Sequence, residues 1–133
     1  DVVKPGPIGV LGYCMGGRLA LVVAGALPDR VRATASLHGT MLISDRPDSP
    51  HLSAHKMRGE LYCGFAENDR FSPPPMIAQM NASFRDTDVA YTSLVHAGAE
   101  HGYALPERDV FDAKATERDW HNILAMFRRQ LGA

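Results

Sequence analysis

The chain has 133 residues, of which 45% are hydrophobic and 22% charged, with a formal net charge of −1. This length suits one ordinary domain with its own core, and the near-neutral charge argues against a polyanion-binding surface, so no nucleic-acid partner is expected. No apolar run approaches the roughly 18 residues of a membrane span, and residues 2–10 do not form a signal peptide. With Cys14 and Cys63 as its two cysteines, the chain is expected to keep reduced thiols and to be cytoplasmic.

The first half of the chain predicts a strand, a glycine-rich turn and a helix in direct succession. Residues 7–13, PIGVLGY, form a short apolar run typical of a strand buried on both faces. Residues 18–27 have the apolar residues of a buried helix, which ends at Pro28. Residues 33–39, ATASLHG, predict a second strand, and the Pro-, Ser- and His-rich residues 44–55 predict a loop with one helical turn.

The second half continues the alternation of strands and helices. Strands are predicted at residues 60–65 and 89–95, with a proline-initiated helix over residues 73–84 between them. In the last helix, Thr116 and Asp119 three residues later predict a capping box at or near its start. This order indicates parallel βαβ units, and therefore an α/β fold of about four parallel strands with helices on both faces. Such sheets bind their ligands at the carboxyl ends of the strands.

Cys14 lies where the first strand meets the first helix, in the segment LGYCMGG. The free N–H groups and the dipole at the start of the helix favour a thiolate there. With Gly12 and Gly16 the segment reads G-x-C-x-G, the pattern of a strained nucleophile elbow with cysteine in the place of serine. The alternative is a structural glycine turn in which Cys14 is a small buried hydrophobe.

A nucleophile of this kind needs a base and an orienting acid, which follow it in the order acid and then histidine. Asp69 comes after the third strand, with Glu67 as a competing acid, and His101 comes after the fourth strand. Each is an ordinary loop residue when taken alone. Together they supply the three residue types in the required order at strand ends that share one edge of the sheet, so a triad of Cys14, Asp69 and His101 is predicted.

The remaining histidines and the second cysteine give weaker signals. His51 and His55 have helical spacing for a metal pair, but no third ligand is suitably spaced, so no metal site is predicted. His38 ends the second strand and either lines a pocket or satisfies the strand end. Core, structural or surface positions are assigned to Cys63, His96 and His121.

Four segments resemble the dienelactone hydrolase family, whose cysteine-dependent members have the α/β-hydrolase fold. They are GPIGVLGYCMGGRLAL, ASLHGT, GFAENDRFSPPP, and the stretch from GAEHGYALPER to the last helix. The resemblance implies that Cys14 is the nucleophile, Asp69 the acid and His101 the base, with the Met15 N–H helping to hold an oxyanion. It also implies hydrolysis of small-molecule carboxylic esters or lactones with no metal or organic cofactor.

Compared with this family, residues 1–133 are expected to form a single partial domain that corresponds to its C-terminal portion. The family's N-terminal strands carry a second oxyanion N–H, a glutamate near the cysteine and an arginine for a substrate carboxylate, and these have no counterpart in the sequence. Leu105 stands near the place of a further arginine, with Arg108 only in the neighbourhood, so no preference for an anionic dienelactone is expected. Side chains expected to line the substrate site are Tyr13, His38, Phe71 and Tyr103.

A truncated sheet would leave the first strand with a bare apolar edge. Such edges favour pairing, so a homodimer through this edge and the adjoining helix faces is predicted. Two functions are compatible with these observations: an ester or lactone hydrolase, and a catalytically weak relative that serves as a dimeric binding or assembly module. A papain-like protease that uses Cys14, a histidine and Asn122 ranks below both, because the nucleophile of that group opens a helix in a different motif.

Overall fold

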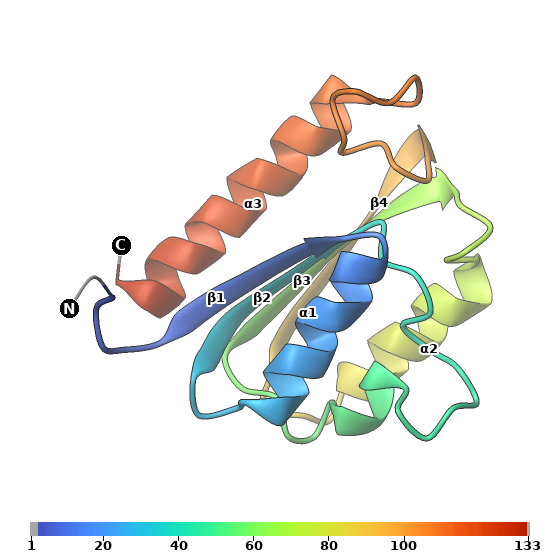
Figure 1. The fold of residues 1–133 in the computed structure, drawn as a ribbon. Helices are drawn as coiled ribbons and strands as arrows, with labels where there is room; N and C mark the ends of the chain where they lie inside the picture. Colours follow the sequence, from blue (N-terminus) through green and yellow to red (C-terminus); the bar gives the residue numbers. More distant parts are fainter. Residues whose placement is uncertain (1–2, 133) are drawn as a thin grey trace.

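The computed structural model describes residues 3–132, which form one parallel sheet with helices on both faces. The sheet has the order β1-β2-β3-β4. Helices α1 and α2 cover one face and α3 the other (Figure 1). The prediction of an α/β fold with four parallel strands is therefore confirmed. The elements are β1 (Ile8–Tyr13), α1 (Met15–Ala26), β2 (Val31–Leu37), the short 3-10 helix η1 (Pro50–Ser53), β3 (Glu60–Asn68), α2 (Pro74–Phe84), β4 (Ala90–Glu100) and α3 (Ala113–Leu131).

Alternation along the strands divides the core into two layers. On β3, Leu61, Cys63 and Phe65 pack towards α1 and α2, whereas Tyr62 and Ala66 pack towards α3. Both sets are buried because each face of a parallel sheet is covered by helices. This explains why the strand segments are nearly continuous apolar runs in the sequence.

Three element boundaries differ from the sequence-based prediction in ways that affect the site. Helix α1 begins at Met15, three residues before its predicted start, so Cys14 lies directly at the junction of strand and helix. Strands β3 and β4 extend to Asn68 and Glu100, beyond their predicted ends at residues 65 and 95. The longer strands bring Asp69 and His101 to the first positions after them.

The predicted capping box at Thr116 and Asp119 is wrong. Helix α3 begins at Ala113, and the Asp112 carboxylate caps it by accepting a hydrogen bond from the Ala115 N–H at 3.0 Å. Thr116 and Asp119 lie inside the helix and are buried against the sheet. The local pattern resembled a cap because the same polar residue types also form buried tertiary hydrogen bonds.

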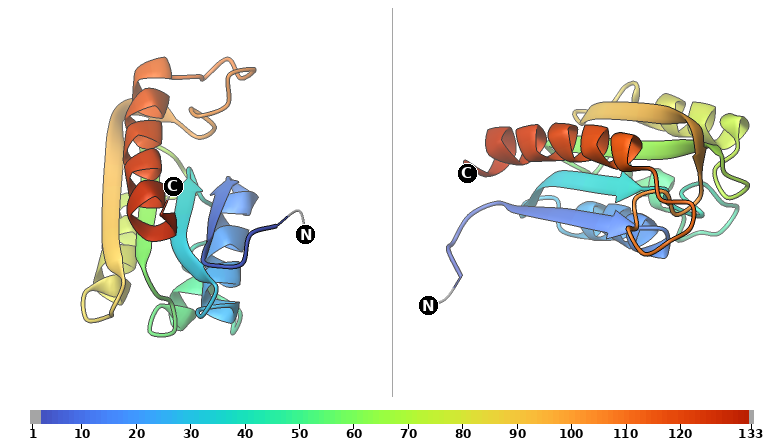
Figure 2. Two further views of the ribbon diagram at one scale, coloured as in Figure 1. Left: turned by 90° about the vertical axis from the view of Figure 1, so that its left-hand side faces the viewer. Right: turned by 90° about the horizontal axis from the view of Figure 1, so that it is seen from above.

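The two edges of the sheet are β1 and β4, as the two views of Figure 2 show. The site described below lies at the carboxyl ends of the strands, where β1, β3 and β4 each lead into a loop or helix. No helix within residues 3–132 combines the length and the apolarity needed to cross a lipid bilayer.

Candidate active site

Cys14 occupies a strained backbone turn between β1 and α1. Its φ of 55° and ψ of −120° are unfavourable for a residue with a side chain. The turn is held from two sides: the Cys14 N–H donates to the Leu37 carbonyl at 3.0 Å, and the Cys14 carbonyl accepts from Gly17 and Thr40 at 3.0 and 3.2 Å. Neighbouring backbone therefore over-determines the strained conformation, as a nucleophile elbow requires.

Close backbone contact explains some of the glycines around Cys14. A Cβ atom at Gly12 would lie 1.9 Å from the Gly16 carbonyl oxygen, and one at Gly17 would lie 2.4 Å from the Ser36 hydroxyl. A Cβ atom at Gly16 would meet nothing within 4 Å. The two glycines of the G-x-C-x-G pattern therefore differ in their need for a small residue. Gly12 and Gly17 are the positions that need to lack a side chain, and Gly16 contributes only its backbone to the close approach.

The side chains of Cys14, His101 and Asp69 form a continuous chain of hydrogen bonds. His101 Nε2 lies 3.2 Å from Cys14 Sγ, and His101 Nδ1 lies 2.8 Å from Asp69 Oδ2. The Asp69 side chain is fully buried and also accepts a 2.8 Å hydrogen bond from the Phe71 N–H. Because a carboxylate only accepts, Nδ1 carries a hydrogen in this arrangement and Nε2 faces the sulfur.

The competing acid, Glu67, does not reach this chain of hydrogen bonds. Its Oε2 atom accepts from the Gly98 N–H at 2.7 Å, and its side chain is exposed at the surface. Of the two acids that follow β3, only Asp69 contacts His101. The two acids are only two residues apart in the sequence, and the path of the chain at the end of β3 decides which of them reaches His101.

The four side chains expected to line a substrate site occupy two different environments. Phe71 is 42% exposed, and the centroid of its ring lies 4.8 Å from that of His101. Tyr13 is half-buried, and the centroid of its ring lies 5.9 Å from that of His38. His38 and Tyr103 are fully buried, and the centroid of the His38 ring lies 5.2 Å from the ring centroids of both His101 and Tyr103. The expectation that these two line the substrate site is therefore corrected: they lie in the interior beside His101.

His38 is an unusual buried residue. Its φ is 38°, and neither of its ring nitrogens has a hydrogen-bond partner. Burial, with a further contribution from the nearby His101, lowers its pKa to about 4. The ring is therefore uncharged near neutral pH, and His101 is packed against a neutral neighbour.

The model of the dienelactone hydrolase family matches residues 1–131. The chain belongs to the dienelactone hydrolase family. It is 29% identical over 132 residues to a Synechocystis sp. protein named "Putative carboxymethylenebutenolidase", and 25% identical over 129 residues to Protein usf of Aquifex pyrophilus. These matches cover 97% and 96% of this chain but only 53% of each relative, so the chain spans about half the length of the proteins it matches.

Solved structures of other proteins have the same arrangement of strands and helices. A dienelactone hydrolase-like promiscuous phosphotriesterase from metagenomic libraries superposes with a TM-score of 0.80 at 19% identity, over 96% of this chain and 54% of that one. A puromycin-hydrolyzing peptidase of Mycobacterium tuberculosis superposes with a TM-score of 0.79 at 20% identity, over 98% and 23%. At these identities the similarity establishes the α/β-hydrolase fold.

The loop after β2 contributes structural support that the sequence did not indicate. The buried Arg18 side chain donates to the Met41 carbonyl at 2.6 Å and forms a 3.2 Å ion pair with Asp48. The Ser72 hydroxyl donates to the Gly39 carbonyl at 2.7 Å and so ties this loop to the loop after Asp69. An arginine on the buried face of a predicted helix is the one signal from which this role could have been inferred.

The remaining candidate residues lie apart from the site. Cys63 is fully buried in the core, where burial raises its thiol pKa to about 12, so its sulfur is unreactive. His51 contacts the Ser49 hydroxyl through Nδ1 at 2.7 Å, and His121 is exposed. Between residues 3 and 132, no group of three or more His, Cys, Asp or Glu side chains is placed to hold a metal ion.

Proposed function

We propose that the chain carries the nucleophile, base and acid of a hydrolase for small carboxylic esters or lactones. The observation that carries the proposal is the hydrogen-bonded chain from Cys14 Sγ through His101 to Asp69. Membership of the dienelactone hydrolase family supports the same reaction class. The strained turn at Cys14 adds support, because such strain concentrates at functional positions.

In this mechanism His101 takes the thiol proton of Cys14, and the sulfur attacks the ester carbonyl carbon. The oxyanion that forms faces the Met15 N–H, which lies in the first turn of α1, where a helix leaves N–H groups without intrahelical partners. When the carbon–oxygen bond breaks, His101 returns the proton to the leaving alkoxide. It then takes a proton from water as the water attacks the acyl-thiol and, when the carbon–sulfur bond breaks, returns that proton to the sulfur, so the acid product leaves and the thiol is restored.

Asp69 acts through His101. Its buried carboxylate keeps the hydrogen on Nδ1, so that the lone pair of Nε2 is directed at the sulfur. The same carboxylate stabilises the imidazolium that forms after proton transfer. Met15 and Phe71 expose apolar surface beside Cys14 and His101, which suits small uncharged acyl groups.

The test is hydrolysis of p-nitrophenyl acetate by the purified chain. Cys14→Ala and His101→Ala are expected to lower the rate by about 10³-fold or more, and Asp69→Asn by a similar order. Cys63→Ala is the matched control and is expected to keep the activity, because Cys63 lies in the core between α1, α2 and the sheet. Intact-mass measurement should detect an acyl group on Cys14. Turnover that survives Cys14→Ala would refute the proposed nucleophile.

A second candidate function is that of a catalytically weak binding or assembly module. The observation that favours it is that β1 pairs only with β2 within residues 3–132, beside a helix whose exposed apolar side chains are Met15, Leu19 and Val22, with Leu27 directly after it. A homodimer through this edge and a cytoplasmic location stay predictions. The two functions differ in their outcome: a folded chain that reacts with an ester once, without turnover, would favour the module.

A further inference from the structure

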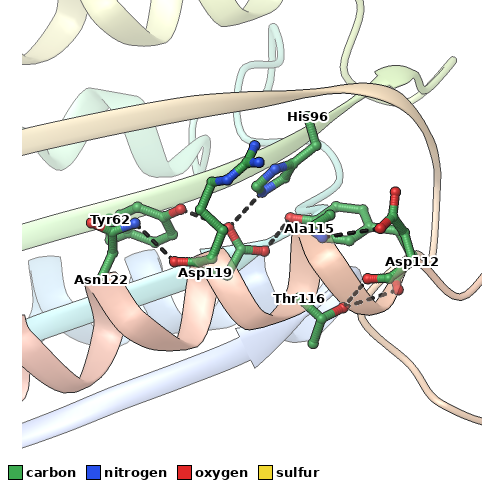
Figure 3. Close-up of polar contacts among 9 residues, drawn as sticks. Tyr62, His96, Asp112, Ala115, Thr116, Asp119 and Asn122 are labelled. Atoms are coloured by element: carbon green, nitrogen blue, oxygen red, sulfur yellow. Dashed lines mark hydrogen bonds and ion pairs between the residues drawn. The ribbon is translucent and has the colours of Figure 1, made fainter.

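The Asp119 carboxylate is fully buried between α3 and the sheet and accepts three short hydrogen bonds. Tyr62 Oη and His96 Nε2 both donate to Oδ1 at 2.6 Å, and Tyr103 Oη donates to Oδ2 at 2.6 Å. Figure 3 shows Asp119 on the helix, facing Tyr62 and His96 of the sheet. The three donors come from β3, from β4 and from the loop after β4, so one carboxylate joins three segments to α3.

Tyr103 connects this cluster to the candidate active site, because it lies two residues after His101. Its carbonyl accepts hydrogen bonds from the Asp112 N–H at 2.9 Å and from the Thr116 hydroxyl at 3.2 Å. Its hydroxyl is held by Asp119, one turn further along α3. Both the backbone and the side chain of Tyr103 are therefore fixed to the first turns of this helix.

The sheet is shaped to admit this contact. A Cβ atom at Gly64 of β3 would lie 2.5 Å from Tyr103 Oη and 2.8 Å from Asp119 Oδ1. Glycine at this position lets the tyrosine hydroxyl and the carboxylate meet directly above the strand. Between His101 and Tyr103, Gly102 has a φ of 93°, a conformation open mainly to glycine, and the Tyr103 N–H donates to the Glu100 carbonyl at 3.0 Å, so the turn that carries His101 is closed by Tyr103.

We infer that Asp119 is a positioning residue that, through Tyr103, holds the His101 imidazole at Cys14. The inference rests on the proposed function, in which His101 is the base for the thiol. Removing the Tyr103 hydroxyl takes away the side-chain anchor of this turn and leaves its backbone hydrogen bonds, so His101 is held less firmly at its 3.2 Å contact with the sulfur. Small displacements of a catalytic group lower rates steeply.

The chain offers a matched pair of variants. Tyr62→Phe and Tyr103→Phe each remove one buried 2.6 Å hydrogen bond to the same carboxylate, but only Tyr103 belongs to the loop of His101. The readout is alkylation of Cys14 by iodoacetamide as a function of pH, with the modified cysteine identified by mass spectrometry. Cys63 does not interfere, because it is fully buried and its pKa is raised to about 12.

Tyr103→Phe is expected to slow the alkylation of Cys14 near pH 7 by about threefold to tenfold, because a displaced imidazole stabilises the thiolate less well. The rate should return to that of the unmodified protein near pH 10, where the thiolate forms without help. Tyr62→Phe should follow the unmodified protein throughout, with a comparable loss of thermal stability. Should Tyr103→Phe fail to fold, Thr116→Val loosens the same loop at the Tyr103 carbonyl and has the same expected effect.

Equal alkylation profiles for the two phenylalanine variants would overturn the inference. His101→Ala separates this result from failure of the proposed function. If His101→Ala slows alkylation and Tyr103→Phe behaves like Tyr62→Phe, His101 assists Cys14 but Asp119 does not position it. If His101→Ala leaves the profile unchanged, the proposed pairing of Cys14 and His101 is itself wrong, and the inference falls with it.

Discussion

Replacing His38 with asparagine should make the free energy of unfolding fall less steeply as the pH is lowered. His38 is fully buried, has no hydrogen-bond partner at either ring nitrogen, and has a φ of 38°. Asparagine tolerates this backbone conformation better than most residues and does not titrate in the relevant range. The variant therefore removes the proton-binding group without demanding a new backbone.

The magnitude follows from the difference in proton affinity between the two states. Burial lowers the pKa of His38 from 6.5 to about 4 in the folded chain. Below about pH 6.5 His38 binds a proton in the unfolded chain but not in the folded chain, so the free energy of unfolding falls as the pH drops towards about 4. This difference in pKa corresponds to a loss of about 3 kcal/mol in the free energy of unfolding. The loss is nearly complete by about pH 4 and is absent above about pH 7.

Urea unfolding of both proteins at about pH 7.5 and about pH 4.5 measures this contribution. The unmodified chain should lose about 2 to 3 kcal/mol more than His38→Asn between these two conditions. His121→Asn is the control, because His121 is exposed on α3. Identical pH dependence in the unmodified chain and in His38→Asn would refute the argument that burial keeps His38 uncharged.

Two further predictions concern the elbow and the sheet edge. Gly12→Ala should lower the free energy of unfolding by at least about 3 kcal/mol, because the added Cβ would meet the Gly16 carbonyl oxygen at 1.9 Å. Gly16→Ala should be neutral or stabilise the chain by up to about 1 kcal/mol, because its Cβ has open space inside a helix, and thermal unfolding of the pair tests both. The edge of β1, which has no partner strand in the described part of the chain, and the exposed apolar side chains of α1 predict a homodimer, which sedimentation at micromolar concentration tests and a monomeric mass would contradict.

The turn at Cys14 shows what a local sequence pattern can predict. Strand, turn, cysteine and helix follow one another within residues 8–26, and the requirement for a small residue at Gly12 arises from Gly16, only four residues away. Interactions of such short range depend on residues that are close together in the sequence, so a local pattern can predict them. For this reason the parallel α/β architecture and the position of Cys14 at a strand end were predictable.

The acid partner and the role of Asp119 are the opposite case. The sequence predicted Asp69 as the acid with Glu67 as a competitor, and the path of the chain after β3 is what brings Asp69 to His101, 32 residues away. The pair of Thr116 and Asp119 predicted a cap because the sequence shows only neighbours. The partners that occupy the Asp119 carboxylate are 57, 23 and 16 residues distant, and the fold alone brings them together.

The sequence by itself therefore determined the order of strands and helices, the strained turn at Cys14 and the residue types of the candidate site. The tertiary structure decided which acid meets His101, that His38 and Tyr103 lie in the interior instead of on the substrate side, and that α3 holds the His101 loop. The physical reason is range. Backbone conformation and burial patterns depend on neighbours in the chain, whereas hydrogen-bond partners of buried polar groups are set by how distant segments pack.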